Sequence, residues 1–303
     1  MIRVDVQAQD LSPEAISGSY SFPSTSPEGG AHLSIFEDTS FILTYFGGYV
    51  KGIYRISSQR INFIPDVAKQ SLVVYGRKTI PLNDSVRFTY SNIDDMRLYV
   101  GLLSKDYLEM TPIFNKSPNC FSYPYKDMKT SIPKKIHFYL NSDYTRKKEI
   151  LYTLVVANEE NDFIVSTISS QRTDVSPFMG SFKEDQLSID GNQPMKRRPF
   201  ENKNDEDYLY LKYLAQKKLI SDTVYYTHDP KEERFYTKEQ VTSTPYDITK
   251  DHYRYPMYNR DTRDLTDTII VHPLYRMKLT EIRKIPKRLT LREEPLFKVT
   301  CDY

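Results

Sequence analysis

The chain of 303 residues carries 42 lysines and arginines against 40 aspartates and glutamates, so its net charge of +2 provides no overall field for nucleic acid or an acidic membrane surface. Its hydrophobic content of 39% is enough for a buried core and excludes disorder of the whole chain. The length is about twice that of the commonest domain, which predicts two domains. The 25 tyrosines and 15 phenylalanines, with no tryptophan, favour sheets with half-buried rings.

The printed sequence shows no pattern typical of a membrane-spanning helix or a signal peptide. No window approaches the about 18 consecutive apolar residues of a membrane-spanning helix, and Met1-Ile-Arg-Val-Asp-Val lacks the apolar region of a signal peptide. The chain as written is therefore expected to be cytoplasmic, with a periplasmic or cell-surface location as the alternative if a signal peptide has been removed. Cys120 and Cys301 are too few to indicate an oxidising compartment; a disulfide and two free thiols both remain open, with free thiols favoured.

The most regular stretch of the chain runs from Gly18 to Phe88. Apolar runs on both sides of Glu37-Asp38-Thr39-Ser40, and a third run after Gly47-Gly48, predict antiparallel strands joined by tight turns. Further short apolar runs bring the expectation to about seven or eight strands within residues 1–110, which is typical of an up-and-down barrel or a sandwich.

Four short patterns stand in this first third: Gly18-x-Tyr20, Leu33-x-Ile35-x-x-Asp38-x-x-Phe41, Gly48-x-x-x-Gly52-x-Tyr54 and Ile61-x-Phe63. In this order they resemble the small lipocalin-like (calycin-type) domains of bacterial envelope proteins. The chain departs from that family by Tyr20, where tryptophan is frequent, and by a long loop from Pro23 to Gly30. The resemblance implies a β-barrel that could enclose a small apolar ligand, and no catalytic residues.

Residues 111–134 contain four prolines and little periodicity, which predicts a connection between two domains. The second domain, residues 135–303, is expected to be rich in strands. Its clearest hairpin is predicted at residues 149–168, around the polar centre Asn158–Asp162, and another at residues 180–191. The predicted fold is therefore mainly β: an antiparallel lipocalin-like barrel in residues 1–110, followed by a second strand-rich domain.

One helix is expected in the second domain, near residues 204–218. Asn204 can cap its start, three acidic residues follow where the helix dipole favours anions, and Lys217-Lys218 stand at its end. Tyr208, Leu211 and Ala215 share one stripe, so the helix is expected to pack on a sheet.

The sequence contains no recognisable catalytic or metal-binding motif. The five histidines are His32, His137, His228, His252 and His272, and no two of them have the i, i+2 or i+4 spacing that places two ligands on one face of a strand or helix. A nucleophile elbow and a phosphate-binding loop are also missing from the sequence. We therefore predict no metal site, no cofactor and no catalytic residues.

The stretch from Asp247 to Asp267 interleaves aromatic rings with arginines, a combination that can stack on bases, sugars or peptide groups. The predicted ligand-binding residues are His252, Tyr253, Arg254, Tyr255, Tyr258 and Arg260. The alternative is a tyrosine-rich loop that packs on a sheet, with its arginines paired to nearby aspartates.

These observations favour a non-catalytic binding or interaction protein, in one form a carrier of a small ligand. The partner is an unknown small molecule or protein, and nucleic acid is not expected. One alternative is a hydrolase in which His252 or His228 meets a distant aspartate only in the folded chain. A second alternative is a structural subunit of a larger assembly.

Overall fold

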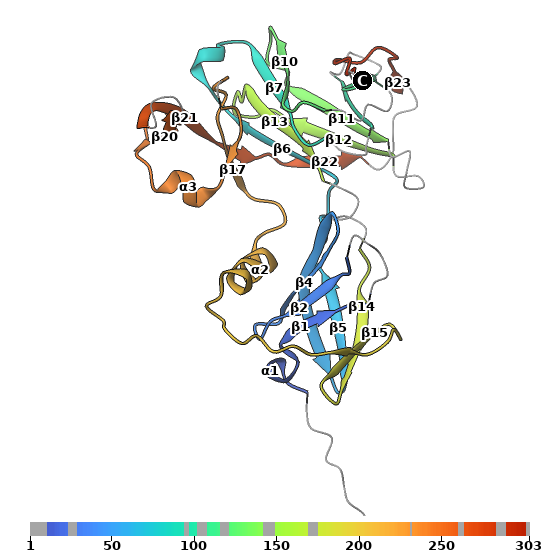
Figure 1. Ribbon diagram of the computed structural model, residues 1–303. Coiled ribbons are helices and arrows are strands. Elements are labelled where there is room, and N and C mark those ends of the chain that lie inside the picture. Colours follow the sequence, from blue (N-terminus) through green and yellow to red (C-terminus); the bar gives the residue numbers. More distant parts are fainter. Residues whose placement is uncertain are drawn as a thin grey trace, which may run out of the picture. The chain divides into compact units, whose positions relative to one another are not determined.

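The computed structural model describes residues 11–23, 29–93, 97–101, 108–115, 121–141, 149–168, 175–230, 232–259, 264–282 and 289–300. The chain forms two compact units, each built from two segments of the sequence (Figure 1). Unit 1 comprises Met1–Lys69 and Ser170–Ile220, and unit 2 comprises Gln70–Ser169 and Ser221–Tyr303. The predicted connection at residues 111–134 does not coincide with this division.

Unit 1 is a nearly closed antiparallel barrel, which confirms the predicted fold class. Its described strands form one 8-stranded sheet in the order β1 (Gly18–Ser21), β2 (His32–Ile35), β3 (Ser40–Tyr45), β4 (Gly48–Ser57), β5 (Arg60–Pro65), β14 (Phe178–Lys183), β15 (Gln186–Ile189) and β16 (Met195–Lys196). Ser19 and Arg198 close the ring by exchanging backbone N–H···O hydrogen bonds of 2.8 and 2.9 Å. This architecture is compatible with a lipocalin-like barrel, although three of its strands come from residues 178–196 rather than from the first 110.

Aromatic rings fill the interior of the barrel. Phe63 lies 4.8 Å from Phe178 and 5.2 Å from Phe41 between ring centroids, and all three belong to one apolar cluster. The buried hydroxyl of Tyr54 donates to the Phe36 carbonyl at 2.8 Å, so its polar end is satisfied. The interior of an eight-stranded barrel is either filled by side chains or holds one small ligand, and in unit 1 apolar side chains occupy it.

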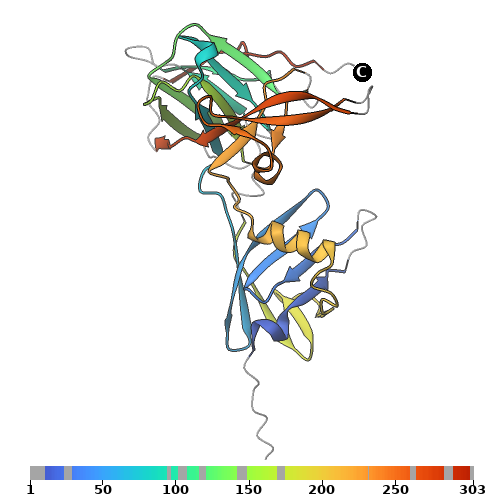
Figure 2. The same ribbon diagram turned by 90° about the vertical axis from the view of Figure 1, so that its left-hand side faces the viewer.

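Two helices pack on the barrel. In α1 (Pro13–Ile16) the cap Ser12 accepts from the Ala15 N–H, and Ile16 is buried in the barrel core. The predicted long helix is confirmed as α2 (Glu206–Gln216), which packs across the barrel strands β3 and β4 (Figure 2). Its cap is Asp205 rather than Asn204, and the predicted stripe packs against Phe36 and Ile42. The helix thus belongs to the unit that contains the barrel.

Unit 2 contains two sheets that enclose an apolar core. Among the described residues, the 9-stranded sheet has the order β10 (Tyr125–Lys129), β7 (Val86–Tyr90), β13 (Asp162–Thr167), β6 (Leu72–Arg77), β21 (Asp264–Arg276), β17 (Thr223–Tyr226) and β18 (Phe235–Tyr236), with β20 (His252–Asn259) paired to β21 and β19 (Tyr246–Asp247) paired to β20. The 6-stranded sheet has the order β22 (Leu279–Ile282), β12 (Glu149–Val155), β11 (Lys135–Asn141), β8 (Arg97–Gly101), β9 (Leu108–Pro112) and β23 (Leu289–Leu291). Phe88 and Phe163 of the first sheet share a core cluster with Phe138 and Tyr152 of the second. Two short helical segments, η1 (Ile80–Leu82) and α3 (Lys238–Thr242), lie in the loops of this unit.

The predicted hairpin at residues 149–168 is wrong. Its two strands, β12 and β13, belong to different sheets: β12 pairs with β11 and β22, whereas β13 pairs with β6 and β7. The polar segment between them is a crossing from one sheet to the other, because both strands carry apolar residues for the shared core. The hairpin predicted at residues 180–191 is confirmed as β14 and β15.

Some expectations fall outside the described residues. Cys120, Cys301 and the apolar residues near the N-terminus are among them, so the thiol question stays open. Among the described helices, none combines the length and the apolar character that crossing a membrane requires.

Candidate functional site

Three charged residues meet at one end of the larger sheet of unit 2. Asp162 is the first residue of β13, which lies between β6 and β7. It is opposite Arg77 in the antiparallel pair with β6 and opposite Arg87 in the parallel pair with β7. Because directly paired residues of neighbouring strands point to the same face, the carboxylate lies between two guanidinium groups.

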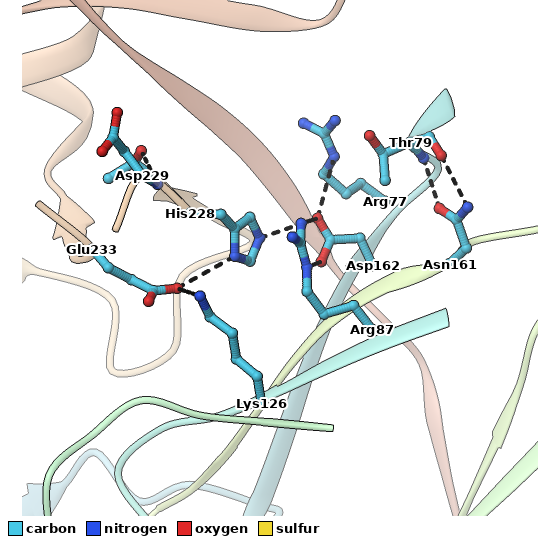
Figure 3. Close-up of polar contacts among 10 residues, drawn as sticks. Arg77, Thr79, Arg87, Lys126, Asn161, Asp162, His228, Asp229 and Glu233 are labelled. Atoms are coloured by element: carbon cyan, nitrogen blue, oxygen red, sulfur yellow. Dashed lines mark hydrogen bonds and ion pairs between the residues drawn. The ribbon is translucent and has the colours of Figure 1, made fainter. Parts of the chain in front are cut away.

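Asp162 is fully buried, and its oxygens are occupied on several sides (Figure 3). Arg87 binds it in a bidentate manner, with Nε to Oδ1 and Nη2 to Oδ2 both at 2.9 Å. His228 Nε2 lies 3.2 Å from Oδ2, and Arg77 Nε lies 3.7 Å from the same oxygen. Since an ionised carboxylate only accepts hydrogen bonds, His228 Nε2 is the donor.

The charge state of Asp162 follows from these contacts. Burial alone would raise the pKa of Asp162, but the hydrogen bonds and the positive charges of His228 and Arg87 outweigh burial and hold that pKa well below its usual range. The residue is therefore a permanent buried anion at neutral pH.

The loop that follows β17 completes this arrangement. His228 Nδ1 lies 3.5 Å from Glu233 Oε1, and Lys126 Nζ of β10 lies 2.7 Å from the same oxygen. The Tyr226 ring stands edge-on to His228 with centroids 4.9 Å apart. We call the six residues Arg77, Arg87, Lys126, Asp162, His228 and Glu233 the Asp162 network; it joins this loop to β6, β7, β10 and β13.

The Asp162 network brings His228 and a distant aspartate together, which is the geometry of a general base and the group that orients it. The second nitrogen of the same imidazole faces Glu233, and the side chain of His228 is only 10% exposed. Within the described residues no serine, threonine or cysteine side chain is hydrogen-bonded to His228. The contacts that are present hold the loop onto the sheet.

Five of the six predicted ligand-binding residues lie on β20, and the described side chains among them have different environments. His252 is 7% exposed, and its ring lies 5.8 Å from that of His272. Tyr253 packs against Tyr225 and Tyr246, and Tyr255 packs against Tyr236 on β18. The Arg254 side chain is exposed. The side chain of Tyr258, and Arg260 as a whole, lie outside the described residues. A role of these residues in binding stays a prediction.

Four tyrosines lie close to one another on this part of unit 2, and two of them interact with the carboxylate of Asp251. Tyr246 donates its hydroxyl to Asp251 Oδ1 at 2.6 Å, and the charge of Asp251 also acts on Tyr275. Tyr253 lies 4.7 Å from Tyr246 and 5.7 Å from Tyr225 between ring centroids. We call Tyr225, Tyr246, Tyr253 and Tyr275 the tyrosine cluster. Tyr246 is 44% and Tyr275 49% exposed, so the cluster presents aromatic surface to solvent.

Asp251 raises the pKa of two hydroxyls of this cluster, those of Tyr246 and Tyr275. The hydrogen bond to Asp251 raises the pKa of Tyr246, and burial followed by the Asp251 charge raises the pKa of Tyr275. Both phenols are therefore hydrogen-bond donors at neutral pH.

Arg77 connects the two groups of residues. Burial lowers its pKa, while the charges of Asp162 and Asp251 oppose that shift. Its Nε and Nη1 are buried and have no hydrogen-bond partner among the described residues. Burial and the positive charge of Arg77 together lower the pKa of His272 to about 3, so this histidine is neutral at physiological pH.

Local sequence could not have identified the Asp162 network as a whole. Arg77 ends one apolar run, and Asp162 begins another 85 positions later. The one local signal that these two residues provide is a charged residue at the end of a buried strand. The partners are set by strand pairing, which the sequence does not contain. Within the described residues no group of three His, Cys, Asp or Glu side chains could hold a metal ion.

The fold and these two groups of residues define a mainly β protein with a nearly closed barrel, a two-sheet unit, a buried ionic network and an exposed tyrosine cluster. Comparison with known proteins yields no matching family model, no matching curated protein and no matching solved structure.

Proposed function

We propose that the protein is a non-catalytic binding protein and that the tyrosine cluster is its binding surface for a protein partner. One observation carries the proposal: Tyr246, whose ring packs against Tyr253, and the nearby Tyr275 both stay nearly half exposed. Ile248, which follows β19 by one residue, is 81% exposed and adds apolar surface.

Tyrosine suits such a surface for a physical reason. Its ring buries a large apolar area at little cost in conformational entropy, and its hydroxyl supplies a hydrogen bond. Asp251 fixes Tyr246, so part of the ordering cost is met before a partner arrives. Aromatic residues of this kind are enriched among those that dominate binding energy.

The filled barrel favours an external binding surface over an internal one. Phe41, Phe63 and Phe178 pack against one another inside unit 1, so a ligand in the barrel would have to displace them. The proposal includes the relation to lipocalin-like domains that the first third of the sequence suggests. In this proposal the lipocalin-like barrel is a scaffold. In this proposal the barrel supports the chain and the other unit binds the partner.

Binding measurements with paired variants test the proposal. Wild-type protein, a Tyr246→Ala/Tyr275→Ala variant and a control Tyr210→Ala/Tyr213→Ala variant on the exposed face of α2 are immobilised and incubated with an extract of the source cells. We expect a defined protein to bind wild type and control and to be at least tenfold depleted on the first variant. Retention of the same proteins in equal amounts on all three immobilised proteins would overturn the proposal. A further assay incubates wild-type protein with an array of oligosaccharides, and binding to oligosaccharides without binding to any protein would also overturn it.

Native mass spectrometry of the purified chain separates two rival functions. A retained small-molecule mass would support a carrier, and a defined multiple of 35.6 kDa would support a structural subunit of an assembly. The proposal expects the monomer mass without an added component.

The contact between His228 and Asp162 favours one second candidate, a hydrolase. In that case a panel of ester, phosphate and peptide substrates would reveal turnover that His228→Gln removes and His32→Gln, at an exposed position, retains. Absence of turnover across the panel would leave the binding proposal as the better account.

A further inference from the structure

A groove of about 610 Å³ lies on unit 1, between α1 and the part of β4 that extends past the turn joining β2 and β3. Its lining residues are Leu11, Pro13, Thr39, Ile53, Tyr54, Arg55, Ile56 and Ser58. The volume falls within the roughly 300–1,000 Å³ of sites that hold small molecules. Half of the lining residues are aliphatic or proline, and Ile53 is 47% exposed.

Among the described residues, no strand pairs with this side of β4 beyond Ile53. Tyr54 donates its N–H to the Thr39 carbonyl at 2.9 Å, on the side of β3. Backbone groups alternate between the two sides of a strand, so the N–H of Ile56 faces the same side as that of Tyr54. The pairing between β3 and β4 ends at Ser40 opposite Ile53, which leaves the Ile56 N–H directed toward the groove.

Arg55 is the one charged residue among those that line the groove. Its side chain is exposed and has no hydrogen bond or ion pair within the described part of the chain. The acidic residues nearby have other partners: Glu37 pairs with Lys203 at 2.6 Å, and Asp38 accepts from Ser40 and Gln216. Hydrogen bonding at the start of α1 lowers the pKa of Glu14.

We propose that this groove binds a small molecule in which a carboxylate ends an aliphatic chain. The carboxylate accepts hydrogen bonds from the Arg55 guanidinium and the Ile56 N–H, a charge-assisted pair of donors. The aliphatic chain covers Ile53 and Leu11, whose apolar surface is removed from water. The groove belongs to unit 1, whereas the tyrosine cluster belongs to unit 2.

Calorimetric titration with decanoate below its micelle concentration tests the proposal. Decanol and decylammonium serve as matched probes, because they keep the chain and remove or reverse the charge. We expect saturable 1:1 binding of decanoate and at least tenfold weaker binding of the other two. Absence of saturable decanoate binding, or tighter binding of decylammonium, would overturn the proposal.

Substitutions then locate the binding site. Arg55→Gln should weaken decanoate binding at least tenfold, and Ile53→Ser should weaken it severalfold, whereas Arg60→Gln on the neighbouring exposed position of β5 should leave it unchanged. Thermal melts of each variant, followed by circular dichroism, verify that the fold is retained. Binding that survives Arg55→Gln but is lost in Tyr246→Ala/Tyr275→Ala would place decanoate at the tyrosine cluster and refute the groove as its site.

Discussion

The barrel of unit 1 and the larger sheet of unit 2 use their interiors for different purposes. The barrel interior is filled by Phe41, Phe63, Phe178 and other apolar side chains, and its buried tyrosine hydroxyls are satisfied by the backbone. The sheet of unit 2 buries the anion Asp162 among cations at one end. Apolar packing tolerates small errors in position, whereas a buried charge needs all of its partners at once. Unit 2 is therefore where a substitution that leaves the side-chain shape nearly unchanged should do most damage.

The largest effect is expected from Asp162→Asn, which leaves the shape nearly unchanged and removes the charge. Arg77 would then be a buried cation, and Arg87 a partly buried one, without this counter-ion. Breaking a buried pair costs about 3–5 kcal/mol. We expect the free energy of unfolding of unit 2 to fall by that amount in urea titrations followed by circular dichroism.

The control for this change is Asp185→Asn, which breaks the more exposed ion pair with Arg197. An exposed pair contributes about 0–1 kcal/mol. If Asp162→Asn were as mild as the control, the network would contribute little to stability.

A comparable loss is expected from Phe63→Ala in the barrel, for a different reason. Removing a fully buried ring that contacts Phe41 and Phe178 leaves a cavity, which costs about 3–5 kcal/mol. Raising the salt concentration should leave this loss unchanged, because no charge is involved. A strong salt dependence of the Phe63→Ala loss would contradict the apolar description of the barrel.

Acid should destabilise unit 2 through His272. Its pKa of about 3 in the folded chain lies below the usual value of about 6.5, so the unfolded chain takes up the proton first. Stability attributable to His272 is therefore fully present above about pH 6.5 and falls as the pH drops toward 3. Because the side chain is partly exposed, we expect a loss of about 1–2 kcal/mol between pH 7 and pH 5.

Unfolding titrations at several pH values measure this loss. In the His272→Asn variant, the free energy of unfolding should fall less between pH 7 and pH 5 than in the wild type. In the His32→Asn variant, changed at an exposed position, it should fall as in the wild type. If the free energy of unfolding fell equally between pH 7 and pH 5 in both variants, another group would be responsible for the loss.

The smallest effect concerns the start of α2. Asp205→Ala removes the side chain that accepts from the Asp207 N–H, which should cost about 1 kcal/mol. Asn204→Ala, one residue earlier, should cost close to nothing. If thermal melts showed a larger loss for Asn204→Ala than for Asp205→Ala, Asn204 would be the cap, as predicted from the sequence.

Neighbouring residues were sufficient to predict a large part of the fold. The strands around Glu37–Ser40 and Gly47–Gly48, the hairpin at residues 180–191 and the stripe of α2 are all confirmed, because each depends on contacts within a few residues. The mainly β class follows from the same local patterns. His228 was also named from sequence, as one half of a histidine and aspartate pair.

Only the tertiary structure decided which strands belong together. The barrel takes β14, β15 and β16 from beyond residue 170, and β12 and β13 separate into different sheets although they are neighbours in sequence. Asp162 meets Arg77, Arg87 and His228 because of those pairings, and Asp251 meets Tyr275 for the same reason. Hydrophobic alternation specifies that a segment is a strand and which face is buried, but many partners satisfy it equally. The choice among them depends on the packing of the whole core, which no local segment contains.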